Sequence, residues 1–203
     1  KSVLFTSSVS VEYWSESKRI ILSVYAAGGF IVNSRVYISN GIKLTFCSVW
    51  EEELGTIVKH IPGHGLTNVD SHIKTPIIKF KSKYLFKNDF STFKNKKSFF
   101  AMTAHIIYEK FDPKNTATHS KIVINKIIRN YLKFKGIIIS DDISMKSLKF
   151  SLNENAIRAL NSGCNLILHC NGKLSEMKKI SKVIPKIDSF TQKKTSDFYN
   201  FLG

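Results

Sequence analysis

Apolar runs of strand length alternate with stretches of helical periodicity from residue 56 to about residue 185. Four of these runs are predicted to be strands, at residues 56–58, 98–103, 137–139 and 164–170. Between and after them, the spacing of apolar residues predicts helices over residues 86–95, 120–134, 153–162 and 175–183. Strand, loop and helix therefore recur four times, which is the pattern of a parallel α/β sheet.

The first 55 residues follow a different pattern. Short β-rich runs are expected at residues 19–25, 30–32, 36–38 and 44–46, with the turn signal Asn40-Gly41 between the last two. This spacing favours hairpins over β/α units. No low-complexity linker interrupts the 203 residues, so we expect a single domain over residues 1–203.

The chain carries 31 Lys and Arg residues against 15 Asp and Glu residues, a formal net charge of +16. Such a charge suits a nucleic acid, an anionic membrane surface or an acidic ligand. The lysines spread along the whole chain, and the densest run, Lys94-Asn95-Lys96-Lys97, is short, so compositional bias is the favoured interpretation. No apolar run approaches the roughly 18 residues that span a bilayer, and three cysteines without a CxxC pair favour a reducing compartment.

Polar residues gather where the predicted parallel strands end. They are Lys59-His60, His105, Asp141-Asp142 and His169. In β/α barrels and in open α/β sheets, the carboxyl ends of the strands line the active site. We therefore expect these side chains at one functional edge.

The loop from Lys59 to His72 concentrates three histidines, two glycines, a proline and an aspartate in fourteen residues. Within it, Asp70 and His72 form a candidate general acid/base pair, because a carboxylate fixes the tautomer of a neighbouring imidazole and raises its basicity. The alternative is that Asp70 only caps a turn. Lys59 and His60 are candidates to bind hydroxyls or an anionic ligand, and simple solvation is the alternative for the lysine.

Asp141 and Asp142 follow a fully apolar strand. Side chains alternate along a strand, so we expect only one of the two to face the site, as a nucleophile or a metal ligand, unless it caps the next helix. His60, His64 and His72 were weighed as metal ligands, but the chain lacks HExxH and paired cysteines at zinc spacing. We expect neither a metal nor another cofactor.

Several stretches, taken in order, resemble one family. KHIPGHG followed by VDSH resembles the signature of glycoside hydrolase family 3, in particular the bacterial cytoplasmic β-N-acetylglucosaminidases of peptidoglycan recycling. MTAHI at 102–106 and GIIISDDISM at 136–145 are similar to later strands of the same family, as is the segment from Ala156 to Leu168. The resemblance covers about residues 55–185.

The resemblance implies a TIM-type (β/α)₈ barrel of the α/β class, here incomplete or remodelled at its N-terminus. It divides the single domain into a divergent segment at 1–55, family-like β/α units at 56–185 and a tail at 186–203. It also implies a cytoplasmic enzyme that removes terminal β-N-acetylglucosamine from peptidoglycan-derived muropeptides with retention of configuration. The expected partner is thus a carbohydrate, with neither nucleic acid nor membrane, and the oligomeric state is left open.

Residue by residue, the resemblance makes Asp141 the nucleophile, His72 the acid/base and Asp70 its carboxylate partner. Lys59 and His60 match residues that bind the sugar hydroxyls. The family's sugar-binding aspartate and arginines have no counterpart in residues 1–55. Two alternative functions therefore stand beside the enzyme: a truncated, non-catalytic remnant of it, and a basic nucleic-acid-binding protein.

Overall fold

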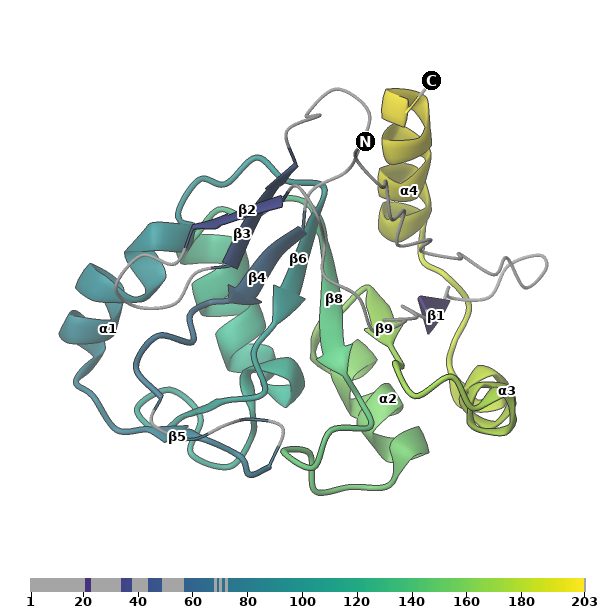
Figure 1. Ribbon diagram of the computed structural model, residues 1–203, viewed down its shortest axis with the longest axis horizontal. Coiled ribbons are helices and arrows are strands. Elements are labelled where there is room, and N and C mark those ends of the chain that lie inside the picture. Colours follow the sequence, from purple (N-terminus) through teal and green to yellow (C-terminus); the bar gives the residue numbers. More distant parts are fainter. Residues whose placement is uncertain are drawn as a thin grey trace, which may run out of the picture.

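The computed structural model of the chain describes residues 21–22, 34–37, 44–48, 57–67, 69, 71 and 73–202. Its centre is a seven-stranded sheet in the order β1-β9-β8-β6-β4-β3-β2 (Figure 1). The strands are β1 (Ile21–Leu22), β2 (Ser34–Tyr37), β3 (Leu44–Ser48), β4 (Ile57–Ile61), β6 (Phe100–Thr103), β8 (Ile137–Asp142) and β9 (Leu166–Leu168). A second, two-stranded parallel sheet pairs β5 (Ile77–Ile78) with β7 (Ile107–Tyr108).

Strands β4, β6, β8 and β9 run parallel to one another, and β1 continues the parallel order beyond β9. These four strands overlap the four runs predicted from the apolar pattern, so the prediction of a parallel α/β sheet is confirmed. The first four residues of β8 are all buried, as expected for a strand covered on both faces.

The other end of the sheet is antiparallel. β2 pairs with β3 and β3 pairs with β4, both in antiparallel register. The expectation of hairpin structure before residue 56 is therefore confirmed for these two strands. The expected run at 30–32 and the Asn40-Gly41 turn lie outside the described residues.

Helices follow the strands of the parallel part. They are α1 (Ser82–Asn88), the 3₁₀ turns η1 (Phe90–Phe93) and η2 (Ala117–His119), the π-helical η3 (Val123–Tyr131), α2 (Leu152–Ser162), α3 (Leu174–Val183) and α4 (Ser189–Leu202). No helix in the described ranges is long and apolar enough to cross a bilayer.

One helical prediction needs correction, and one further helix was not predicted. The helix expected over residues 86–95 is instead α1, which ends at Asn88, followed by η1. The hydroxyls of Ser91 and Thr92 donate to the carbonyls of Lys87 and Asp89, and such local bonds compete with helix continuation. The segment expected as a tail contains α4, where Phe198 packs on Phe99 and Phe100 beside the start of β6.

The core has a layer on each face of the parallel strands. One layer joins Ile138 of β8 and Ala101 of β6 to the buried residues of η3, among them Ile124 and Ile128. The other layer gathers Met102, Ile137, Ile139, Leu166 and Leu168. Burial on both faces holds the strands in register and thereby fixes where their carboxyl ends lie.

Candidate active site

The carboxyl ends of β4, β6, β8 and β9 lie at one edge of the sheet because these strands are parallel (Figure 1). The candidate residues Lys59, His60 and Asp141 lie at the ends of their strands, and His105 and His169 follow β6 and β9 closely. The expectation that one edge collects these polar residues is thus met by the topology.

Two of these strand ends are irregular, and both irregularities fall on candidate residues. In the pairing of β4 with β6, Lys59 opposes Met102 while Ile61 opposes Thr103, so His60 is an extra residue on β4. In the pairing of β8 with β9, Ile139 opposes Leu166 while Asp142 opposes Leu168, which leaves one extra residue on β8 before Asp142. Bulges of this kind re-aim side chains and are frequent beside active sites.

These bulged strand ends bring His60 and Asp141 together. The imidazole Nε2 of His60 lies 3.3 Å from Oδ2 of Asp141, although β6 separates their strands. The other carboxylate oxygen of Asp141, Oδ1, accepts the backbone N–H of Asp142 at 2.9 Å. Oδ1 of Asp141 thus has a backbone N–H partner and Oδ2 faces the His60 ring, and these two contacts orient the side chain.

The imidazole of His60 is neutral at physiological pH. Burial lowers its pKa from 6.5 to about 4, and the Asp141 carboxylate only partly opposes this shift. A neutral imidazole donates from one nitrogen alone, and Asp141 Oδ2 accepts only if the proton sits on Nε2. The 3.3 Å approach of His60 to Asp141 is therefore a contact between a neutral imidazole and a carboxylate, and not an ion pair between two full charges.

Asp142 plays a different part from its neighbour. Its Oδ1 accepts the backbone N–H groups of Ser144 and Cys170, and its Oδ2 accepts the Ser144 hydroxyl. These bonds close the turn after β8 and tie it to the end of β9. Neither aspartate caps the next helix, since α2 has Ser151 as its N-cap; Asp142 closes the turn, while Asp141 faces His60.

The first half of the histidine loop is anchored on the protein. The buried Tyr108 hydroxyl of β7 donates to the carbonyl of Gly63. The Asp89 carboxylate lies so close to Gly63 that a Cβ there would meet it at 2.3 Å, so the residue must be glycine for this approach. The ring of His64 lies 5.4 Å from that of His60, and its nitrogens lie 3.4 Å from the hydroxyls of Thr67 and Ser71.

The acid/base pair of the sequence prediction, Asp70 and His72, lies outside the described residues. Its roles stay a prediction from the motif. Lys59 is partly buried at the end of β4, beside His60. The metal alternative also depends on His72, and among the described residues no group of three His, Cys, Asp or Glu side chains is placed to hold an ion.

Other polar residues support the edge and carry no motif of their own. His169 is fully buried, and its Nε2 lies 2.9 Å from Oε2 of Glu176 on α3. Asn155 of α2 donates from its amide to the carbonyls of Ile143 and Phe150 and so folds the loop after β8. The buried Tyr108 and Asp89 give no sequence signal beyond their polarity within apolar stretches.

Comparison with known proteins shows which family the sequence resembles. The profile described as "Glycosyl hydrolase family 3 N terminal domain" matches residues 35–197. The β-hexosaminidase of Haemophilus ducreyi is 38% identical over 125 residues, which cover 58% of this chain and 36% of that protein. The β-hexosaminidase of Photobacterium profundum is 32% identical over 160 residues, which cover 73% of this chain and 47% of that protein. The chain thus spans between a third and a half of these relatives.

Solved structures give the same result for the fold. NagZ from Neisseria gonorrhoeae, in complex with N-trifluoroacetyl-D-glucosamine, matches with a TM-score of 0.61 at 25% identity, over 72% of this chain and 41% of that chain. The family 3 β-N-acetylglucosaminidase of a Paenibacillus strain matches with a TM-score of 0.64 at 24% identity, over 71% of this chain and 30% of that chain, which supports the fold alone.

The prediction of an α/β fold related to an incomplete β/α barrel is confirmed by these neighbours and by the parallel strands of the described residues. The predicted family is confirmed as well. Because the family profile covers far more than half of its residues, the chain belongs to glycosyl hydrolase family 3, within that family's N-terminal domain.

Proposed function

We propose that the chain is a retaining glycosidase that removes terminal β-linked N-acetylglucosamine, with Asp141 as its nucleophile. The observation that carries the proposal is the 3.3 Å contact between His60 Nε2 and Asp141 Oδ2 at the carboxyl ends of two parallel strands. A carboxylate at such a strand end, with a backbone N–H on one oxygen and the His60 ring beside the other, is oriented for attack on one face of a bound sugar.

In the proposed reaction, a carboxylate oxygen of Asp141 attacks the anomeric carbon while the bond to the leaving oxygen breaks. His72 gives its proton to that oxygen, and Asp70 stabilises the imidazole as it loses and regains charge. A water molecule then attacks the same carbon, gives its proton to His72 and releases Asp141 as a carboxylate. Two inversions leave the sugar with its original configuration.

Lys59 and His60 complete the proposal as sugar-binding residues. Both lie in β4 beside the nucleophile, where the Lys59 ammonium can donate to a sugar hydroxyl and the unprotonated ring nitrogen of His60 can accept from one. The motif resemblance further favours muropeptides as natural substrates and the cytoplasm as the place of reaction. The relatives named β-hexosaminidase are consistent with an N-acetylhexosamine as the sugar released.

The direct test is release of nitrophenol from a nitrophenyl β-N-acetylglucosaminide by the purified 203-residue chain. Asp141→Ala should abolish turnover, and Asp142→Asn, which keeps an oxygen acceptor for the Ser144 and Cys170 N–H groups, should retain it. Turnover that survives Asp141→Ala would overturn the assignment of the nucleophile. No turnover by the wild-type chain, together with a weakly cooperative melt, would identify a non-catalytic remnant.

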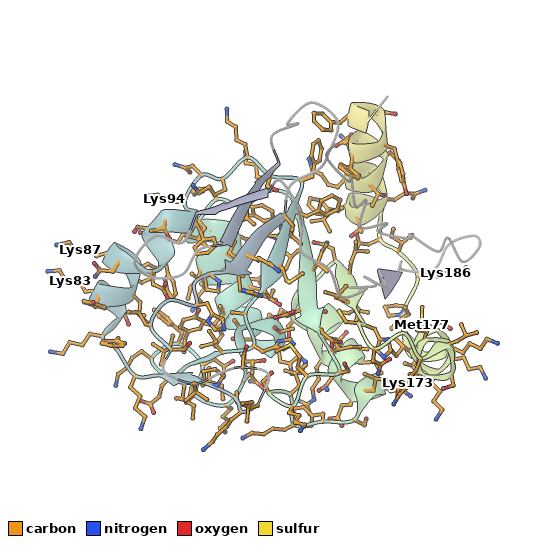
Figure 2. The ribbon with its side chains drawn as sticks, in the orientation of Figure 1. Lys83, Lys87, Lys94, Lys173, Met177 and Lys186 are labelled. Atoms are coloured by element: carbon orange, nitrogen blue, oxygen red, sulfur yellow. The ribbon has the colours of Figure 1, made fainter. Side chains whose placement is uncertain are left out.

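The basic charge does not favour nucleic acid as the ligand. Lys83, Lys87 and Lys94 project from one side of the molecule, and Lys173 and Lys186 lie on the other side (Figure 2). Positive charge in the described residues is thus distributed over separate faces, as the compositional interpretation predicts. Binding of duplex DNA that weakens steeply with salt would contradict this view.

A further inference from the structure

One buried histidine beside the candidate site has no part in the proposed reaction. His105 follows β6, between the strands of His60 and Asp141, and only 1% of its surface is exposed. Its Nε2 lies 3.0 Å from the backbone carbonyl oxygen of Asp142. Its Nδ1 lies 2.7 Å from the hydroxyl of Thr118 on η2. Both nitrogens of a buried imidazole are therefore bonded.

The acceptors around His105 fix the position of its proton. The carbonyl oxygen of Asp142 only accepts, so Nε2 of His105 carries the hydrogen. Nδ1 of His105 lies 2.7 Å from the hydroxyl of Thr118, which also donates to the Ala104 carbonyl at 3.3 Å. The hydroxyls of Thr103 and Thr118 lie 2.8 Å apart. These contacts form a continuous buried chain that ends on Asp142.

The carbonyl that receives this chain belongs to the turn that orients Asp141. The N–H of Asp142 binds Oδ1 of Asp141, and the carboxylate of Asp142 holds the backbone of Ser144 and Cys170. His105 therefore holds the carbonyl of Asp142. The N–H of the same residue orients the nucleophile, and its carboxylate holds the following turn. A shift of this residue would carry the Asp141 carboxylate away from His60.

We propose that His105 is a positioning residue, which holds the Asp141–Asp142 turn of β8 so that the Asp141 carboxylate meets His60. The expected loss of kcat rests on the proposed function. The expected displacement of Asp141 rests on the geometry alone. Misplacement of a reacting group by about 1 Å can lower kcat on the order of 100-fold. The ring itself touches neither His60 nor the carboxylate through any of these bonds.

The chain contains a matched control for His105. His119, the residue after Thr118 in η2, is also buried, and its Nε2 lies 3.1 Å from a backbone carbonyl, that of Asn155 on α2. Replacement of either histidine removes a buried bond to a backbone carbonyl, and His105 loses its contact with Thr118 as well, so His105→Phe should lose at least as much stability as His119→Phe. Only the bond of His105 ends on the turn that carries Asp141.

The kinetic test compares His105→Phe, His105→Gln and His119→Phe in nitrophenyl β-N-acetylglucosaminide hydrolysis. His105→Phe should lower kcat on the order of 100-fold with KM changed less than about threefold, the signature of a lost transition-state arrangement. Glutamine places an amide N–H near the position of Nε2 and should restore most of the loss. Equal loss of kcat in His105→Phe and His119→Phe, or no rescue by glutamine, would overturn the proposal.

A second measurement, by NMR, does not depend on turnover of a substrate. The NMR signal of the His60 ring N–H hydrogen is sensitive to the Asp141 carboxylate, whose Oδ2 lies 3.3 Å from Nε2. It should move upfield in His105→Phe and in Thr118→Val, which keeps His105 but removes its hydroxyl partner, and stay in place in His119→Phe. An unchanged His60 signal in the first two variants contradicts the positioning role. Absence of wild-type turnover would refute the proposed function, and this NMR result would still decide the role of His105.

Discussion

His60 of β4 and Asp141 of β8 meet across β6, with Nε2 of the imidazole 3.3 Å from Oδ2 of the carboxylate. Each residue lies at a bulge, where an extra residue shifts the register against the neighbouring strand. The contact unites the two halves of the proposed site, since one strand leads into the histidine loop and the other carries the nucleophile.

Replacement of His60 by phenylalanine should remove the polar ring beside Asp141 and a hydrogen-bonding group for the sugar at once. We expect kcat/KM for a nitrophenyl β-N-acetylglucosaminide to fall on the order of 100-fold or more, because lost preorganised polar groups weaken transition-state binding. His64→Phe removes the neighbouring ring and its two 3.4 Å contacts with Thr67 and Ser71, and should cost far less. Equal effects of the two variants would contradict a specific role for the His60–Asp141 contact.

Folding stability should fall as the pH drops from about 6.5 to about 4. Burial lowers the pKa of both His60 and His119 from 6.5 to about 4. In this window the unfolded chain binds protons that the folded chain does not, so the free energy of unfolding declines, and its full value is present above pH 6.5. Urea denaturation at a series of pH values measures this slope.

The variant His119→Gln should make that slope shallower, because glutamine keeps a donor to Asn155 and does not titrate. Glu176→Gln should leave the slope unchanged above pH 4.5. Hydrogen bonds from Asn171 and His169 lower the pKa of Glu176 to about 2, so its contribution is lost only as the pH falls through the range below 4.5. A pH-independent stability between pH 6.5 and 4 would contradict the neutral, buried state of the two histidines.

Arg129→Met should destabilise the fold by about 3 kcal/mol, because hydrogen bonds from a charged group contribute more than neutral ones. The guanidinium of Arg129 donates to the carbonyls of Phe134 and Gly136 and to the side chain of Asn165, and so ties η3 to the start of β8 and to β9. Chemical denaturation measures the loss.

Arg158→Met is the control for this prediction. Arg158 pairs with Glu154 on the exposed side of α2 and stacks over the Phe150 ring. Exposed pairs of this kind contribute little, so the loss should stay near or below about 1 kcal/mol. Similar losses for the two arginines would show that the buried bonds of Arg129 are not the source of its effect.

Gly63→Ala should impair catalysis through the loop. The new Cβ would meet the carboxylate of Asp89 at 2.3 Å, so either Asp89 or the loop must move. Since the Tyr108 hydroxyl anchors the same residue, we expect kcat/KM to fall clearly while the free energy of unfolding changes little. An active Gly63→Ala enzyme with wild-type kinetics would show that this close approach does not position the loop.

The sequence predicted the parallel strands because the apolar runs of β6, β8 and β9 are continuous, which only burial on both faces explains. It also predicted α2, whose start is set by the Ser151 side chain accepting from the N–H of Glu154 and whose end is set by Gly163 at a φ of 115°. Helix α4 was missed because polar residues interrupt its apolar positions and its stability comes from Phe198 packing on Phe99 and Phe100.

The sequence predicts which residues belong to the candidate site, but it does not predict which of them contact one another. The positions directly after apolar runs identified the candidates Asp141, His60 and Lys59. In the structure these residues lie at one edge of the sheet. Which aspartate of the pair faces His60 depends on a bulge, and the pattern of residue types does not reveal a bulge. The bonds of His105, Thr118 and Asn155 depend on segments brought together only by the fold.

Covalent capture of the nucleophile tests the account most directly. The 203-residue chain is incubated with a 5-fluoro-N-acetylglucosaminyl fluoride, which forms the glycosyl ester and slows its hydrolysis, and the product is mapped by peptide mass spectrometry. We predict one added fluorinated sugar on Asp141, retained in Asp142→Asn and absent in Asp141→Asn. A label on another residue, or no label on a folded wild-type chain, would contradict the claim that Asp141 is the nucleophile of a retaining glycosidase.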